Sequence, residues 1–138
     1  MAGVSEGALR AVSVRLRFRR HGLRLAVCKL GLMEPLPAWA VGGEFLAVVR
    51  TPAEVSVVCE EARVPKEAVA ERGWAAVELA GPFDFALAGI LASALNPLAE
   101  AGIGIFAIST FDTDWILVKH ERADEAVRAL IGAGHNEI

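Results

Sequence analysis

Three carboxylates in the second half of the chain are the first candidates for a binding or catalytic role. Asp112 and Asp114 lie close together in the run Thr110-Phe-Asp-Thr-Asp114, and Asp84 lies upstream of them. Carboxylates in turns commonly accept hydrogen bonds from nearby backbone amides and so shape the turn. They also attract cations, so a turn-forming role and a ligand-binding role are the two alternatives for these residues.

The sequence contains no motif typical of the common enzyme classes. G-x-S-x-G, the P-loop and H-E-x-x-H are all absent. We expect the three histidines, His21, His120 and His135, to be solvated rather than catalytic. Gly102-Ile-Gly104 is too short for a dinucleotide fingerprint and precedes a predicted strand, so we interpret it as a turn.

The two cysteines, Cys28 and Cys59, lie in apolar runs and have no C-x-x-C partner. Small secreted folds usually carry more cysteines at closer spacing, and zinc sites need clustered ligands. We therefore expect reduced core cysteines in a cytoplasmic protein, with a disulfide as the alternative, and no metal or other cofactor.

Composition narrows the class of protein further. The chain has 138 residues, of which 54% are hydrophobic and 22% charged, which is enough apolar material for a folded core. No apolar run approaches the ~20 residues that span a bilayer. The net charge is −3, and from residue 25 onward 16 acids face eight bases. An acidic body argues against nucleic acid as the partner.

Residues 1–22 are predicted to be a basic extension. Six arginines fall within residues 1–24, four of them between Arg15 and Arg20. A secretory signal needs an apolar core behind its positive end, and this segment has none. A mitochondrial presequence is one remaining interpretation, and a poorly ordered extension or a misassigned start codon is the favoured one.

Patterning predicts alternating strands and helices. Strands are expected at 24–30, 45–51, 55–59, 74–80, 103–109, 115–119 and 136–138; helices at 65–72, 85–101 and 123–131. A proline-rich connector occupies 34–40. From residue 74 onward the order is β-α-β-β-α-β, which is the ferredoxin-like α+β pattern of an antiparallel sheet with helices on one face.

The two halves of the chain resemble each other at an offset of 59 residues. Thr51 then aligns with Thr110, and Cys59 with Val118. We predict two ferredoxin-like units in tandem, a degenerate one at 23–73 and a complete one at 74–138.

The same topology predicts where the carboxylates gather. The strand that ends before Gly81 and the strand that ends before Thr110 are parallel because a helix connects them, so the loops 81–85 and 110–114 share one edge of the sheet. The start of the helix favours an anion, whereas Asp84, Asp112 and Asp114 favour a cation. A small zwitterion such as an amino acid carries both charges.

Four segments resemble the ACT-domain family, in particular its branch of small aspartate-kinase-like bacterial proteins and the animal cytosolic arginine sensor. They are Gly81-Pro-Phe-Asp-Phe-Ala-Leu-Ala-Gly-Ile-Leu-Ala-Ser93, Pro97-Leu-Ala-Glu-Ala-Gly-Ile103, Phe106-Ala-Ile-Ser-Thr-Phe-Asp-Thr-Asp-Trp-Ile-Leu-Val118 and Arg50-Thr-Pro-Ala-Glu-Val-Ser-Val-Val-Cys59. The resemblance covers residues 23–138 and implies tandem βαββαβ ACT units, the first degenerate.

ACT domains are regulatory modules that bind amino acids between paired domains, and the resemblance implies which residues bind here. Matching motif to motif gives these ligand contacts: Asp84, Ile90, Leu91, Thr110, Phe111 and Asp114, with Asp112 inside the last segment. Gly89 joins them because the amides from Gly89 to Leu91 are expected to hold the ligand carboxylate. Leu87 replaces an acidic residue of the arginine sensor and Asp84 replaces a glycine, so a polar or basic amino acid is expected, without specificity for arginine.

These observations predict a non-catalytic, amino-acid-binding regulatory protein. A homodimer is expected through the helices at 85–101, with Leu91, Ala94, Leu95 and Leu98 at the contact, and a partner enzyme is possible. The alternative is a dimerisation or docking scaffold whose pocket stays empty. An enzyme is a third interpretation, for which the candidate site offers no nucleophile or base.

Overall fold

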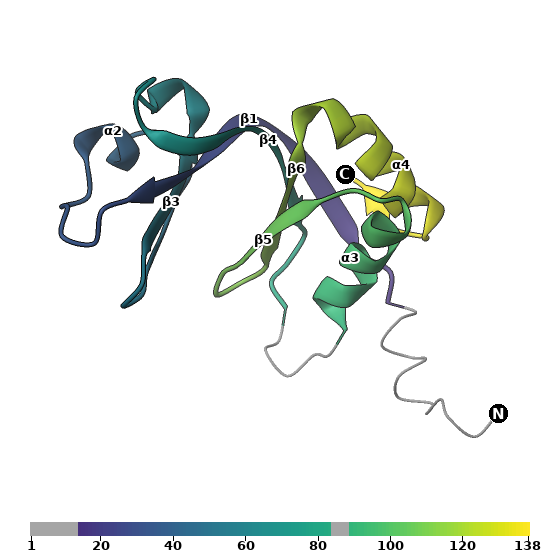
Figure 1. Cartoon of the computed structure of the whole chain (residues 1–138). Helices are drawn as coiled ribbons and strands as arrows, with labels where there is room; N and C mark the ends of the chain where they lie inside the picture. The colour runs from purple at the N-terminus through teal and green to yellow at the C-terminus, as the bar shows by residue number, and fades with distance from the viewer. Residues whose placement is uncertain (1–13, 84–88) are drawn as a thin grey trace. The chain divides into compact units, whose positions relative to one another are not determined.

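The computed structural model describes residues 14–83 and 89–138 (Figure 1). It divides into two compact units. The first unit is Gly22–Ala75, and the second consists of the described residues within 1–21 and 76–138. The strands β1 (Arg17–Leu30) and β4 (Val69–Leu79) each continue from one unit into the other.

The first unit is a four-stranded sheet with little helix. Its strands are the second half of β1, β2 (Leu46–Arg50), β3 (Val55–Glu60) and the first half of β4, in the order β2-β3-β1-β4. β3 is antiparallel to both β1 and β2. The connection after β1 contains only the four-residue helix α2 (Ala38–Val41), and a 3-10 turn (Glu61–Arg63) follows β3.

One face of this sheet holds the core of the first unit. The core consists of Ala26, Cys28, Ala40, Val57, Cys59 and Val64, with Leu30, Trp39, Ala68 and Ala70 packed against it. Both cysteines are free and buried, as predicted. Because α2 supplies a single buried residue, most of the core comes from the strands themselves.

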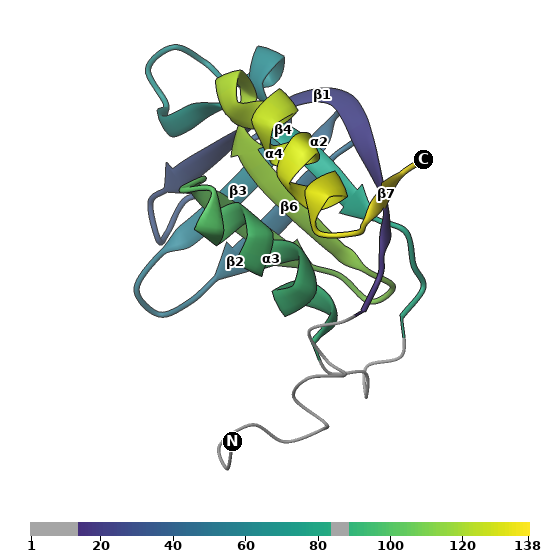
Figure 2. The ribbon, with the colours of Figure 1, turned by 90° about the vertical axis from the view of Figure 1, so that its right-hand side faces the viewer.

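The second unit has the β-α-β-β-α-β order that the sequence predicts. After β4 come α3 (Ile90–Glu100), β5 (Ile105–Ser109), β6 (Asp114–Lys119), a 3-10 turn (His120–Arg122), α4 (Ala123–Gly132) and β7 (Asn136–Glu137). The strand order is β1-β4-β6-β5, and β7 pairs in parallel with the start of β1. α3 and α4 lie together on one face of this sheet (Figure 2). The predicted α+β fold, with an antiparallel sheet and helices on one face, is therefore confirmed.

One predicted boundary and one predicted helix are wrong. β1 begins at Arg17 rather than at residue 24, because Leu16 and Phe18 alternate with arginines and are 4% and 0% exposed in the second unit. The predicted helix at 65–72 is absent, and β4 occupies its second half because pairing with β1 outweighs the helical propensity of Ala, Glu and Arg there. The predicted start of the next helix, residues 84–88, lies outside the described residues.

The predicted contact between two α3 helices is also corrected in part. Ala94 and Leu98 are 0% and 1% exposed, because this stripe of the helix faces the core of its own unit. These two side chains are therefore not accessible to a second copy. Leu91 and Leu95 are half-buried.

Candidate functional site

The turn between β5 and β6 is built by its own threonines. The Thr110 N–H donates to the Thr113 carbonyl at 2.8 Å, and the Thr110 hydroxyl donates to the same carbonyl at 3.0 Å. The Thr113 N–H lies 3.2 Å from the Thr110 hydroxyl oxygen, which accepts from it. Threonine hydroxyls stabilise tight turns in this way. The hydroxyl of Thr110 is thus engaged within the turn.

This turn is fastened to the end of β4. The Phe83 N–H donates to the Asp112 carbonyl at 2.9 Å, and the Thr113 hydroxyl donates to the Leu79 carbonyl at 2.6 Å. Gly81 passes so close that a β-carbon there would lie 2.6 Å from the Asp112 carbonyl oxygen. The segments 81–83 and 110–113 therefore lie side by side at one edge of the second unit.

The carboxylates of the turn have different surroundings. Asp114 is the first residue of β6 and lies opposite Ser109, whose hydroxyl donates to its carboxylate. Asp112 is exposed, and Phe111 at the tip of the turn is 80% exposed. Asp84 lies outside the described residues. The Asp114 carboxylate therefore accepts a hydrogen bond from a side chain across the hairpin, and its turn-forming and ligand-binding roles both stay predictions.

Gly89, Ile90 and Leu91 form the start of α3. Gly89 is the residue before the first turn, with a φ of 83°, a left-handed conformation that glycine adopts without strain. Among the described residues, no side chain caps the helix there. The Ser93 N–H donates to the Gly89 carbonyl and the Ser93 hydroxyl to the Ile90 carbonyl, at 2.9 and 3.0 Å. The hydrogen bonds described for Gly89 and Ile90 thus have their partners in α3, whereas the turn at 110–113 is bonded to the end of β4 and the residues that follow it.

Sequence reasoning missed the buried side chain of His135. Its Nδ1 accepts from the Leu16 N–H at 3.0 Å, so Nε2 carries the proton and donates to the Ser93 carbonyl at 2.7 Å. At 3% exposed, His135 is not solvated as predicted. His21 also differs from the prediction, since it is half-buried, lies 2.9 Å from Glu78 and stacks on Trp115. No local pattern marks either histidine, because each partner is distant in sequence.

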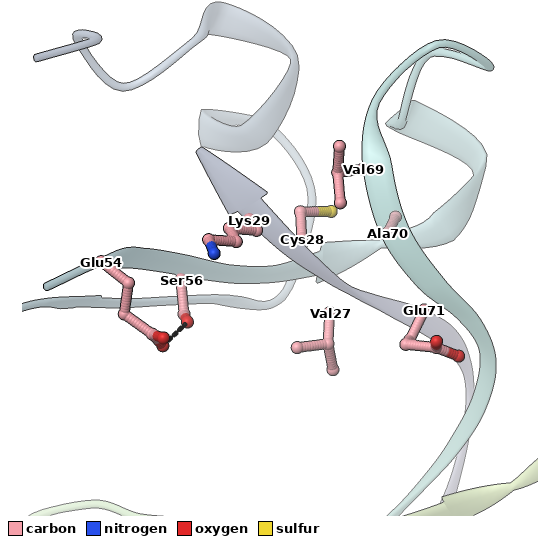
Figure 3. Close-up of a pocket in the computed structure, with 8 residues that line it drawn as sticks. All are labelled: Val27, Cys28, Lys29, Glu54, Ser56, Val69, Ala70 and Glu71. Carbon is pink, nitrogen blue, oxygen red and sulfur yellow. Dashed lines mark hydrogen bonds between the residues drawn. The ribbon is translucent and has the colours of Figure 1, made fainter. Parts of the chain in front are cut away.

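Each unit also has a surface hollow. One of about 240 Å³ lies in the first unit, lined by Val27, Cys28, Lys29, Glu54, Ser56, Val69, Ala70 and Glu71 (Figure 3). There the Ser56 hydroxyl donates to Glu54 at 2.9 Å. A second hollow of about 320 Å³ lies in the second unit, lined by Arg17, Arg19, Glu78, Ala80, Gly81 and Ile138. It reaches Gly81, next to the turn described above.

Within residues 14–83 and 89–138, no group of three or more histidine, cysteine, aspartate or glutamate side chains is arranged to hold a metal ion. No helix in the same part of the chain is long and apolar enough to cross a membrane.

An antiparallel sheet with two helices on one face, preceded by a reduced version of the same arrangement, defines a regulatory-domain fold of the ACT class. The family model described as an ACT domain matches residues 69–131, and a model for an N-terminal domain matches residues 24–67. The chain belongs to the ACT-domain family.

Three solved structures illustrate the relationship. Protein Atu0741 from Agobacterium tumefaciens is 36% identical over 91% of this chain and 93% of its own, with a TM-score of 0.85. VC0802 from Vibrio cholerae, described as a protein of unknown function and possible transport protein, is 18% identical over 91% and 98%, with a TM-score of 0.74. The ligand-free regulatory subunit of aspartate kinase from Thermus thermophilus is 15% identical over 85% and 97%, with a TM-score of 0.60. The last two share the fold alone. No curated protein matched the sequence.

Proposed function

We propose that the protein is a non-catalytic regulatory module that binds a free amino acid at the edge of its second unit. The observation that supports this most strongly is the junction of 81–83 with the turn at 110–113, where the Phe83 N–H bonds the Asp112 carbonyl. It brings the end of β4 beside a turn that carries two carboxylates. Membership of the ACT-domain family supports a small-molecule ligand.

The proposed site has an anion-binding part and a cation-binding part. The main-chain amides from Gly89 to Leu91, which no described side chain caps, would receive the ligand carboxylate. Asp114 would face the ligand ammonium or a cationic side chain, with Asp112 nearby and Asp84 in the connecting segment. Thr110 and Phe111 would shape the wall of the site. Such a site suits a polar or basic amino acid.

The remaining features of the proposal follow the sequence predictions. We expect a homodimer in the cytoplasm, without a cofactor and without catalysis of its own, and an enzyme is a possible partner. The alternative, a dimerisation or docking scaffold with an empty pocket, differs in a single measurable property, which is amino-acid binding.

A thermal-shift screen against the twenty common amino acids tests the proposal. A ligand that binds only the folded protein raises the melting temperature, because it adds a stabilisation of RT ln(1 + [L]/Kd) that grows with the logarithm of the ligand concentration. We expect one or a few polar or basic amino acids to raise it, and titration calorimetry should then give a saturable isotherm. No shift with any of the twenty, together with a flat isotherm, would favour the scaffold instead.

A further inference from the structure

The start of β1 carries two exposed arginines, Arg17 and Arg19, on a backbone that is bonded on both sides. The Arg17 carbonyl accepts from the Ala80 N–H at 2.8 Å, and the Phe18 carbonyl accepts from the Ile138 N–H at 2.8 Å. β7 pairs in parallel with this part of β1 (Figure 2). The main chain that carries the two arginines is therefore fixed between the end of β4 and β7.

Arg17 and Arg19 project from the same face of the sheet. Successive side chains of a strand alternate between its two faces, so residues two apart share a face. Phe18, which lies between them, is 0% exposed and points into the core on the opposite face. The two arginines thus lie on the outer face, with their Cα atoms about 6.5–7 Å apart at the rise of an extended strand.

Neither arginine is neutralised by the described part of the chain. Their neighbour Arg20 donates to Asp124 at 2.6 Å and to Glu137 at 3.4 Å. Among the described residues, the side chains of Arg17 and Arg19 have no ion pair and no hydrogen bond. Two guanidinium groups are therefore available to an anion that does not belong to the chain.

These two side chains line the hollow of about 320 Å³ in the second unit. Sites for small molecules commonly have volumes of about 300–1,000 Å³, so the hollow suits a small ligand. Glu78 is the acidic side chain of its lining, and its carboxylate lies 2.9 Å from His21 Nε2. Ile138, the last residue of the sequence, also lines the hollow, and no ion pair joins it to either arginine in the described structure. The arginines thus outnumber the acidic side chain, which already has a partner.

A phosphate group matches two guanidinium groups better than a single carboxylate does. A phosphate monoester carries a charge of about −1.5 to −2 at pH 7 and three acceptor oxygens. A carboxylate carries one negative charge and two oxygens, which one arginine can bind in a bidentate manner. Because arginine binds both groups, the number of charges and acceptors decides between them in favour of phosphate.

We propose that Arg17 and Arg19 form a binding site for the phosphate group of a small molecule. Both guanidinium groups donate to the phosphate oxygens, and the rest of the molecule lies in the hollow beside Ala80 and Gly81. The chain has a net charge of −3, so its overall field does not attract anions and binding depends on these two side chains. The site goes beyond the proposed amino-acid site and does not rest on it.

Titration calorimetry at fixed ionic strength tests the site with three phosphate probes. The probes are inorganic phosphate, glycerol 3-phosphate and AMP, and succinate serves as a dianion without phosphorus. We expect saturable binding of the phosphate probes and weaker binding of succinate. Tighter binding of an ester would identify an organic phosphate as the source, and equal affinities would identify inorganic phosphate; both outcomes support the site.

Substitution of each arginine tests its role. Arg17→Gln and Arg19→Gln each remove one guanidinium group and should weaken phosphate binding about tenfold. Arg17→Lys keeps the charge but loses the planar fork, so its affinity should lie between those of the wild type and Arg17→Gln. Arg24→Gln is the matched control, because it makes the same change in charge at an exposed position of β1 outside the hollow. We expect it to bind as the wild type does.

Several results would overturn the proposal. They are the absence of saturable binding with all three phosphate probes, unchanged affinity in the double variant R17Q/R19Q, and an equal loss in Arg24→Gln. Succinate that binds as tightly as the phosphate probes would overturn the assignment to phosphate. The melting temperature of each variant without ligand checks its fold, and we expect little change because both side chains are exposed. The amino-acid screen on the same variants should be unchanged, so failure of either site is recognised separately.

Discussion

The main-chain N–H of Phe83 donates a 2.9 Å hydrogen bond to the carbonyl of Asp112. This bond attaches the segment that follows β4 to the turn between β5 and β6, which lies far from it in the sequence. The hydroxyl of Thr113 adds a second attachment, to the Leu79 carbonyl. Together they fix the position of the turn that carries Asp112 and Asp114.

Adding a methyl group at Gly81 should disrupt this attachment. In Gly81→Ala the new β-carbon would lie 2.6 Å from the Asp112 carbonyl oxygen and 3.1 Å from the Thr113 β-carbon, and the first of these contacts is to backbone. We expect the free energy of unfolding to fall by about 1–3 kcal/mol, measured by urea denaturation. Gly104→Ala is the control, because a β-carbon there meets nothing within 4 Å. Equal stability of the two variants would contradict the proposed close packing at Gly81.

Asp114→Asn tests the role of this carboxylate in binding. Asparagine keeps an oxygen that can accept from the Ser109 hydroxyl, so the hairpin should fold normally while the charge is lost. If Asp114 binds the ligand cation, a charge-assisted hydrogen bond worth about 1.5–3 kcal/mol disappears, which lowers affinity about tenfold to a hundredfold. Titration calorimetry with the amino acid found in the screen measures this.

Ser109→Ala is the companion variant, because it removes the cross-strand partner and keeps the Asp114 charge. We expect it to bind nearly as the wild type does. If Asp114→Asn binds the amino acid with unchanged affinity, Asp114 has only a structural role in the hairpin.

His135→Ala should lower stability more than an exposed histidine does. It leaves the Leu16 N–H and the Ser93 carbonyl without their partner in a buried position, and it also opens a cavity. Unsatisfied buried groups cost about 1–3 kcal/mol each, so a total loss of about 3 kcal/mol is expected. His120→Ala, at an exposed position, should change stability little. Similar melting temperatures for the two variants would argue against a bridging role for His135.

Stability should fall in alkaline solution because of the buried thiols. Burial, with the neighbouring Cys28, raises the pKa of the Cys59 thiol to about 11, from an ordinary value of 9.0. Between these values the unfolded chain has lost a proton that the folded protein keeps. The contribution is therefore fully present below pH 9 and is lost as the pH rises toward 11, by roughly 1.4 kcal/mol per pH unit at most.

Urea denaturation at several pH values between 8 and 11 measures this slope. Burial also raises the pKa of Cys28, which acts in the same direction. The chain contains no tyrosine, so no phenol titrates over this range. Cys59→Ala should show a shallower slope than the wild type, whatever its stability at neutral pH. Parallel slopes would contradict the raised pKa of Cys59.

The hairpins and α4 could be predicted because local patterns specify them. β2 and β3 flank Pro52, β5 and β6 flank a threonine-bounded turn, and α4 carries a regular apolar stripe. The start of β1 differs from the prediction because the density of positive charge there favours a tail, although Leu16 and Phe18 alternate with arginines. The start of β4 differs because its residues have helical propensity, and only pairing with a distant strand makes them extended.

The candidate site could be predicted only as far as topology and local turns determine it. A helical connection between parallel strands is enough to bring 81–83 near the turn at 110–113. The contacts that fasten them, from the Thr113 hydroxyl and the Phe83 amide, depend on distances that no sequence spacing encodes. The same holds for His135, whose two partners precede it by 119 and 42 residues.

Because β1 and β4 each contribute residues to both units, we expect that the two units cannot be produced as separate folded fragments. The segment 69–131, excised by itself, would lack the part of β1 that neighbours β4, and the segment 24–67 would lack β4 altogether. Each fragment would expose a row of unpaired backbone groups along a central strand, a state prone to aggregation. Separate family models match residues 24–67 and 69–131, but we do not expect either segment to stay folded once the chain is cut between them. We expect the whole chain to unfold in one cooperative step.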